Sequence, residues 1–309
     1  MQNSRHKQRL MLWGNRLRNG FTLVELLVTL GIIGVVLAIL LPAVQSAREA
    51  MRRTSCENRI RQSALAIQNF ESTHRLLPGN GGPTEENRLI SVSGESVRPY
   101  THEFATGIRR FWGVGTAKSP IDEQPGPWTW AILPQFEQAH LHVDHVFVDR
   151  VSTYLCPSRP RPTPQPPQAD YFGEYEAGGH AMAKTDFAAN HLVILDRGSV
   201  VRLKDVRDGL SQTMLLGEKV IDPFVQDGTS WYWDEPIYIA GSKGTARAGE
   251  LILTDAVNVR FRDNWGSSHS ALAYFAFVDG HVRSLTNQTD ADVLNALLTP
   301  DDGDQPPSF

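Results

Sequence analysis

The hydrophobic pattern of this chain begins with one apolar run, residues 21–41, which contains a single charged side chain, Glu25. As an α-helix the run extends about 31 Å at roughly 1.5 Å per residue, close to the hydrocarbon thickness of a bilayer. Residues 1–20 carry five basic and no acidic side chains, which favours a cytoplasmic N-terminus. We therefore expect one span of the cytoplasmic membrane, with the remainder of the chain exported to the periplasm or the cell exterior.

A second helical pattern follows Pro42. Proline removes one backbone N–H from the helix, so we expect a bend at Pro42 and not an end. The sequence Leu77-Pro78-Gly79 ends the pattern. Residues 42–76 are therefore predicted to continue the helix as an amphipathic segment, packed against a globular head at 77–309. The predicted apolar stripe consists of Val44, Ala47, Met51, Cys56, Ile60, Ala64, Ile67 and Phe70.

The sequence of the head predicts short helices and strands joined by loops. Residues 78–127 are rich in Gly, Pro and Ser, which predicts a long loop with short strands at most, and 127–141 regain helical spacing. Prolines between 157 and 167 predict an extended loop. We assign no role to the 78–127 and 158–184 segments. Strands are expected within 185–191, at 213–216 and in the aromatic stretch 230–240, whose alternation favours packing over sugar binding.

The most specific local pattern in the head is a pair of β-prone runs on either side of Asp279-Gly280. This dipeptide suits a two-residue type I′ turn, which would place Phe277 opposite Val282. We expect His269 to be a structural residue that braces this hairpin. The predicted fold class is α+β: a long N-terminal helix packed on an antiparallel sheet.

Charge and cysteine content narrow the function. Without residues 1–20 the chain has 25 basic and 34 acidic residues, a net of −9, which disfavours nucleic-acid binding. Cys56 and Cys156 are the two cysteines, too few for a four-cysteine zinc site. On the exported side we expect them to form a disulfide; two separate buried thiols are the alternative.

Catalytic and metal-binding patterns are weak. Ser268, His269, Asp279, His281 and Glu218 suggest a hydrolase, but the chain lacks GxSxG, Walker A, Rossmann and HExxH motifs, so we expect no enzyme activity.

A metal site is suggested by one short histidine-rich run. On a strand, His140, His142 and Asp144 would share a face and offer metal ligands, but a solvated strand edge is the expected role. We therefore expect no metal site and no cofactor.

Gly20 followed by FTLVELL resembles the cleavage and methylation signal of type IV prepilins and pseudopilins. The resemblance implies that a prepilin peptidase removes the leader, residues 1–20, between Gly20 and Phe21 and methylates Phe21. It also implies that Glu25 takes part in assembly and that Pro42 occupies the position of a helix-bending proline. An uncleaved signal anchor is the alternative.

A second resemblance covers most of the chain, from residue 20 to about 286. The segments SCENRIRQSALAIQNFESTHRLLP, PWTWAILPQFEQ, YLCPS and VRDGLSQTMLLGE, with nine residues between His269 and Asp279-Gly280, are similar to a poorly characterised pseudopilin-like family. It implies a structural subunit that assembles with other pseudopilins in a type II secretion or type IV pilus-like system. The alternative is a solitary membrane-anchored module that binds a solute or glycan. Some secretion pseudopilins also use calcium near the C-terminus, so the acidic tail is a secondary candidate for a calcium site.

Overall fold

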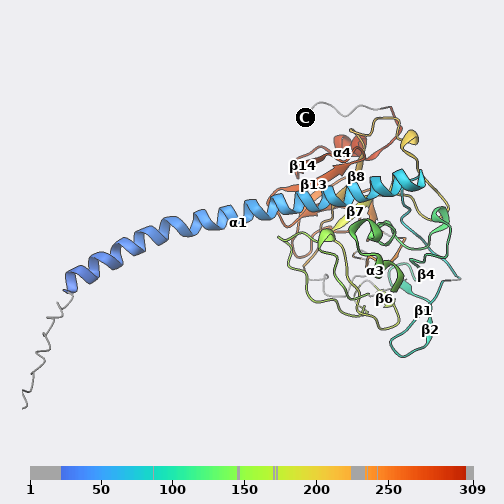
Figure 1. Cartoon of the computed structure of the whole chain (residues 1–309), viewed down its shortest axis with the longest axis horizontal. Coiled ribbons are helices and arrows are strands. Elements are labelled where there is room, and N and C mark those ends of the chain that lie inside the picture. The colour runs from blue at the N-terminus through green and yellow to red at the C-terminus, as the bar shows by residue number, and fades with distance from the viewer. Residues whose placement is uncertain are drawn as a thin grey trace, which may run out of the picture. The chain divides into compact units, whose positions relative to one another are not determined.

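The computed structural model describes residues 22–85, 87–144, 147–169, 171, 173–223, 234, 236–241 and 243–303. The chain divides into two units, Met1–Glu49 and Ala50–Phe309, and each is described by itself. Helix α1, Leu23–His74, contributes to both units and continues through Pro42, as predicted (Figure 1).

In the first unit, every large apolar side chain of α1 from Leu23 to Val44 is exposed. A soluble helix normally buries an apolar stripe, and a helix that is apolar all round belongs in a membrane or a large core. The helix is long and apolar enough to cross a membrane. Its position near the N-terminus and its exposure agree with the predicted span.

The head is built on a five-stranded sheet with the order β10-β7-β8-β13-β14 (Figure 1). Its neighbouring strands are antiparallel except for the parallel pair β10 and β7. The bounds are β7 Phe187–Asn190, β8 Met214–Glu218, β10 Ala246–Arg247, β13 Leu272–Phe277 and β14 Val282–Thr286. The strands predicted within 185–191 and at 213–216 correspond to β7 and β8.

Two apolar clusters cover the two faces of this sheet. Along β13, Ala276 belongs to the cluster that includes the α1 residues Ile60, Ala64, Ile67 and Phe70. Ala273, Phe275 and Phe277 belong to the other cluster, with leucines of α4, Ala291–Leu298. This alternation follows from the two-residue period of a strand. The head end of α1 and the short α4 therefore pack on opposite faces of the sheet.

The remaining strands are short, as predicted for 78–127. A three-stranded antiparallel sheet has the order β4-β3-β6, and three strand pairs, β1 with β2, β5 with β9 and β11 with β12, complete the list. Their bounds are β1 Leu89–Ile90, β2 Ser96–Val97, β3 Tyr100–Glu103, β4 Arg109–Phe111, β5 Gly113–Val114, β6 Gly173–Glu176, β9 Ile239–Ala240, β11 Ile252–Thr254 and β12 Trp265–Ser267.

Short helices fill the connections. They are η1 Ile121–Glu123, α2 Trp128–Ala131, η2 Leu133–Phe136, α3 Ala139–Asp144, η3 Ser152–Tyr154 and η4 Leu203–Asp205. The helical spacing predicted for 127–141 is therefore present, broken into short pieces. Trp231 to Trp233 of the aromatic stretch lie outside the described residues, while Tyr238 is fully buried before β9.

The predicted hairpin is present, but its turn differs from the prediction. Ala276 pairs with Val282, so Phe277 does not face Val282. Instead, the Phe277 N–H donates to the His281 carbonyl at 2.9 Å, and Gly280 has a φ of +89°. A three-residue loop that ends in a left-handed glycine replaces the two-residue type I′ turn.

A contact with α1 supports this longer turn. Gln68 Nε2 on α1 donates to the Val278 carbonyl at 2.8 Å. Glycine is favoured here by its positive φ angle, and a Cβ atom added at Gly280 would lie 2.9 Å from Gln68 Nε2, so the end of that side chain would have to shift. The turn is therefore docked on the helix.

Candidate functional site

The first candidate site is the start of α1, next to the predicted cleavage position. Gly20 and Phe21 lie outside the described residues. The Thr22 N–H and hydroxyl donate to Glu25 Oε2 at 2.9 and 2.8 Å, and the Glu25 N–H donates to the Thr22 hydroxyl at 3.3 Å. This reciprocal pair is a capping box, which satisfies backbone groups at a helix start.

Sequence reasoning singled out Glu25 as an assembly residue, but it missed the pairing with Thr22. The signal was present, since T-x-x-E before an apolar run is the usual pattern of a capping box. In the described chain Glu25 is hydrogen-bonded to Thr22, within its own first turn. In sequence, Glu25 follows by four positions the residue at which cleavage would create a new amine.

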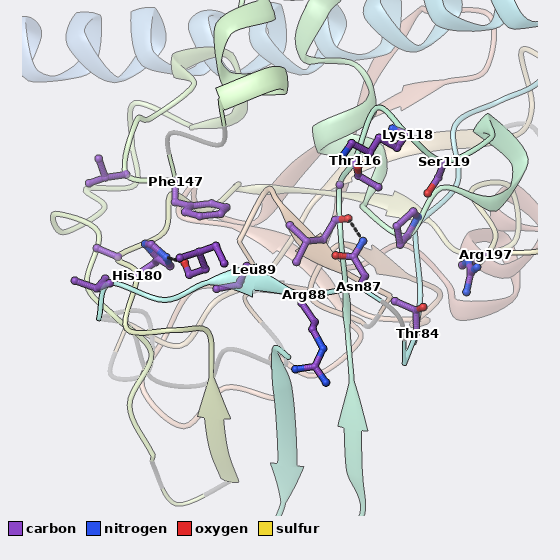
Figure 2. Close-up of a pocket in the computed structure, with 17 residues that line it drawn as sticks. Thr84, Asn87, Arg88, Leu89, Thr116, Lys118, Ser119, Phe147, His180 and Arg197 are labelled. Carbon is purple, nitrogen blue, oxygen red and sulfur yellow. Dashed lines mark hydrogen bonds between the residues drawn. The ribbon is translucent and has the colours of Figure 1, made fainter. Parts of the chain in front are cut away.

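The second candidate site is a cleft in the head with a volume of about 930 Å³. It is lined by the segment before β1, by β5 and the residues after it, by Phe147 and Val148, and by His180 and Arg197. In Figure 2, Phe147 and His180 lie at one end, and Thr84 and Arg197 at the other. We call it the head cleft.

Hydrogen bonds and one ring contact hold the walls of the head cleft in place. Asn87 Nδ2 donates to the Val114 carbonyl at 2.8 Å, and His180 Nε2 lies 2.6 Å from the Ile90 carbonyl, to which it can donate (Figure 2). The ring of Phe147 lies 4.8 Å from that of His180, between centroids. Sequence reasoning assigned no role to the 78–127 segment, which supplies most of this lining.

The third candidate site is the surroundings of the disulfide. The structure joins Cys56 on α1 to Cys156, as predicted, with 4.9 Å between their Cα atoms. His269 Nε2 lies 3.5 Å from Cys156 Sγ and 4.0 Å from Glu218 Oε1. All four side chains are buried. Sequence reasoning predicted the disulfide and singled out His269 and Glu218, but it did not predict that these two residues lie beside the disulfide.

This location corrects the role predicted for His269. The histidine lies before the start of β13, whereas Asp279 and Gly280 follow its end, so the strand separates them. Six residues of strand extend about 20 Å. His269 packs beside the disulfide and edge-on to Tyr274, and it does not brace the turn. At the turn, His281 Nδ1 lies 2.6 Å from Asp279 Oδ1 instead.

The hydrolase arrangement is likewise split between two places. Ser268, His269 and Glu218 lie near the disulfide end of β13, and the Asp279–His281 pair lies at the turn. The five residues therefore do not form one constellation.

Glu218 is a neutral acid at this centre. Burial raises the pKa of its carboxyl to about 8, because the Tyr274 N–H, at 2.9 Å from Oε2, and the charge of Arg159 offset the desolvation only in part. Within the described chain, its Oε1 atom has no hydrogen-bond partner. Glu218 therefore carries a proton at neutral pH in the folded head.

We predict that Glu218→Gln changes how head stability depends on pH. The folded pKa of Glu218 is raised above the 4.5 of the free side chain, so its contribution is fully present below about pH 4.5 and is lost as pH rises to about 8. The wild type should lose stability across this window relative to the glutamine variant. Thermal unfolding at pH 4.5, 6.5 and 8 measures the difference. Parallel curves for the two proteins would contradict the raised pKa.

The histidine-rich run is helical, and one aspartate of the acidic tail caps a helix. The strand considered for His140, His142 and Asp144 is wrong, since these residues lie on the helix α3. His142 stacks on Trp130 with 3.8 Å between ring centroids. In the tail, Asp290 Oδ1 accepts the Asp292 N–H at 2.9 Å and so caps α4.

Only one group of possible metal ligands occurs among the described residues. It consists of Cys56, Cys156, Glu218 and His269, whose ligand atoms lie within 4.8 Å of one another. The two sulfur atoms are joined to each other in the disulfide. The oxidised centre therefore offers no thiolate ligand.

A network of buried charges lies beside this centre, and sequence reasoning missed it. Arg159 and Arg161 come from the proline-rich loop but are buried. Asp186 Oδ1 lies 3.1 Å from Arg159 Nη1 and 2.7 Å from Arg161 Nε. Its Oδ2 accepts the Cys156 N–H at 2.6 Å. Asp186 thus joins the loop, the disulfide segment and the start of β7.

The network extends further through Asp234 and Asp255. Asp234 Oδ1 lies 2.8 Å from Lys219 Nζ and accepts a hydrogen bond from Arg161 Nη2 at 3.0 Å. Arg159 Nε donates to Asp255 at 2.8 Å. Burial lowers the pKa of Lys219 to about 7, although the pairing with Asp234 opposes this shift. Such a network is a structural feature, because every charge in it has an opposite partner.

Comparison with known proteins places the chain in a family. It belongs to the family described as "Protein of unknown function (DUF1559)", which matches residues 45–292. A second match, the "Prokaryotic N-terminal methylation motif", covers residues 15–41. No curated protein and no solved structure matches the chain. The motif and the exposed apolar helix together fit a pilin-like subunit anchored in a membrane by one span.

Proposed function

We propose that this protein is a pseudopilin-like assembly subunit of a type II secretion or type IV pilus-like system. A prepilin peptidase cuts between Gly20 and Phe21 and methylates Phe21. The helix then anchors the protein in the cytoplasmic membrane, with the head on the periplasmic or extracellular side. Its role in this proposal is assembly with other pilin-like subunits and not catalysis, and it requires no cofactor.

The observation that carries the proposal is a carboxylate near the start of a helix that bears a methylation motif and whose large apolar side chains from Leu23 to Val44 are exposed. A charged group within a membrane span costs about 2.5–3.5 kcal/mol at the bilayer centre, so Glu25 gains from an oppositely charged partner. The amine created at Phe21 by cleavage supplies one, either within the same chain or on a neighbouring subunit. A simple membrane anchor has no need of such a carboxylate.

The test compares Glu25→Ala with Glu25→Gln in the native membrane. Glutamine retains the capping box with Thr22 but loses the charge, whereas alanine loses both. Crosslinking of membranes should give multimers for the wild type and few or none for either variant. Mass spectrometry should find the same methylated Phe21 terminus in all three proteins, which separates assembly from processing.

Two results would overturn the proposal. A protein that retains Met1 in its native membrane would remove the processing step. Equal multimer yields from the wild type and both variants would remove the assembly role. If multimers are lost only in the Glu25→Ala protein, Glu25 supports assembly by capping the helix and not by pairing with the amine of Phe21.

A second candidate is a solitary anchored module that binds a solute or glycan. The head cleft favours it, because an assembly subunit needs no cavity of about 930 Å³ in its head. In that case the Glu25 variants should crosslink as the wild type does.

A further inference from the structure

The charged side chains in the described lining of the head cleft have one sign. Arg88, Lys118 and Arg197 line it together with His180, and no Asp or Glu is among the described lining residues. The three long basic side chains are all exposed. This is unexpected in a chain whose acidic residues outnumber its basic ones by nine once residues 1–20 are removed. The cleft is thus a local site of attraction for anions.

A neighbouring hollow extends this basic surface. It has a volume of about 560 Å³ and shares Thr84 and Arg197 with the head cleft. Arg109 and Arg110 line it, and Glu85 is the one acidic residue in its described lining. Two adjoining hollows with a shared wall fit an extended ligand better than a single small ion.

The uncharged residues that line the head cleft indicate which kind of molecule carries the acidic groups. Hydroxyl and amide side chains lie between the cations of the head cleft, namely Thr84, Asn87, Thr116 and Ser119 (Figure 2). Phe147 adds an aromatic face at one end. Sugar hydroxyls pair with such polar groups, and the apolar face of a sugar ring packs on an aromatic ring. Pockets of this size hold ligands of several rings, in the usual range of about 300–1,000 Å³.

We propose that the head cleft and its neighbouring hollow bind an acidic polysaccharide, whose sugar rings carry carboxylate or sulfate groups. Arg88, Lys118 and Arg197 contact the acidic groups, and the polar side chains between them contact the hydroxyls. This site lies wholly in the head. It therefore binds its ligand whether or not the subunits assemble.

The binding test uses the full-length Glu25→Ala protein in detergent, so that a failure of assembly does not affect the result. Fluorescent oligogalacturonate and dextran sulfate distinguish a carboxylate from a sulfate ligand, and neutral dextran controls for sugar alone. At least one acidic glycan should bind, and binding should weaken as salt is raised from 50 to 300 mM, because exposed charges are screened. Neutral dextran should not bind.

Two double variants test whether the acidic glycan binds in the head cleft. Arg88→Gln with Lys118→Gln should reduce affinity for the acidic glycan by at least about tenfold. Lys204→Gln with Arg207→Gln removes two exposed positive charges that do not line the cleft and should change affinity by less than about twofold. Equal losses in both double variants would overturn the proposal. So would the absence of binding to either acidic glycan, or equally tight binding of single-stranded DNA.

Discussion

Asp186→Asn should lower the free energy of unfolding of the head by about 3–5 kcal/mol, the usual cost of removing one partner of a buried ion pair. Burial alone would raise the pKa of Asp186, but Arg161, Arg159 and the Cys156 N–H hold it below its ordinary value. The carboxylate is therefore charged in the folded head. The amide has nearly the same size, so the loss comes from the charge and not from a cavity.

Thermal unfolding of the full chain in detergent measures this effect. For a unit of this size, 1 kcal/mol corresponds to roughly 2–4 °C, so Tm should fall by about 6–20 °C. Glu57→Gln is the matched control, because its pair with Arg61 at 2.7 Å is partly exposed on α1 and should contribute at most about 1 kcal/mol. If Asp186→Asn and Glu57→Gln have a similar Tm, the Asp186 ion pairs stabilise the head no more than a surface ion pair does.

The pairing of the buried charges could not be predicted from the sequence. The proline-rich loop forms no helix or strand in its described residues, as expected of a loop, but nothing in its composition indicates that the side chains of Arg159 and Arg161 are buried. Their partners Asp186, Asp234 and Asp255 lie 25 to 96 residues further along the chain. Periodicity identifies an apolar face, whereas the pairing of isolated charges depends on tertiary contacts that no local pattern records.

The helix α1 was the most predictable element, because its signals are long and repeated. An apolar run and a stripe at steps of three or four residues are sufficient to define it. Within the stripe, however, burial begins only at Cys56, and Val44, Ala47 and Met51 are exposed. The pattern identifies which side is apolar, but not whether the same chain or another molecule covers it.

The predictions that differ from the structure concern short segments. The run at 139–144 is too short for periodicity to distinguish a helix from a strand, and Glu137, with a φ of +61°, ends η2 immediately before it. The hairpin turn at Asp279-Gly280 was located correctly but is one residue longer than expected. In both cases neighbouring structure selects among conformations that the local sequence permits. The head cleft could not be predicted, since the segment that supplies most of its lining meets Phe147, His180 and Arg197 only in the folded head.

Replacing both Cys56 and Cys156 by alanine should lower the free energy of unfolding by about 4–5 kcal/mol. The disulfide links residues 100 positions apart, and the chain-entropy estimate for a loop of that length is about 4.7 kcal/mol. The bond also fixes α1 to the segment whose Leu155 carbonyl accepts a hydrogen bond from Arg59 at 2.6 Å. Its loss therefore affects the joint between the helix and the rest of the head.

Single variants separate this bond from two independent buried thiols. If the disulfide is present, either Cys→Ala change breaks it, so each single variant should lose nearly as much stability as the double variant. If the cysteines acted separately, the single losses would be smaller and would sum to that of the double. Thermal unfolding of the three variants, with thiol titration of the denatured wild type, decides between them. Two free thiols in the unreduced wild type, together with additive losses, would exclude the bond. The expected result is no free thiol in the wild type and one in each single variant, which would lie beside His269 and Glu218 in the buried centre.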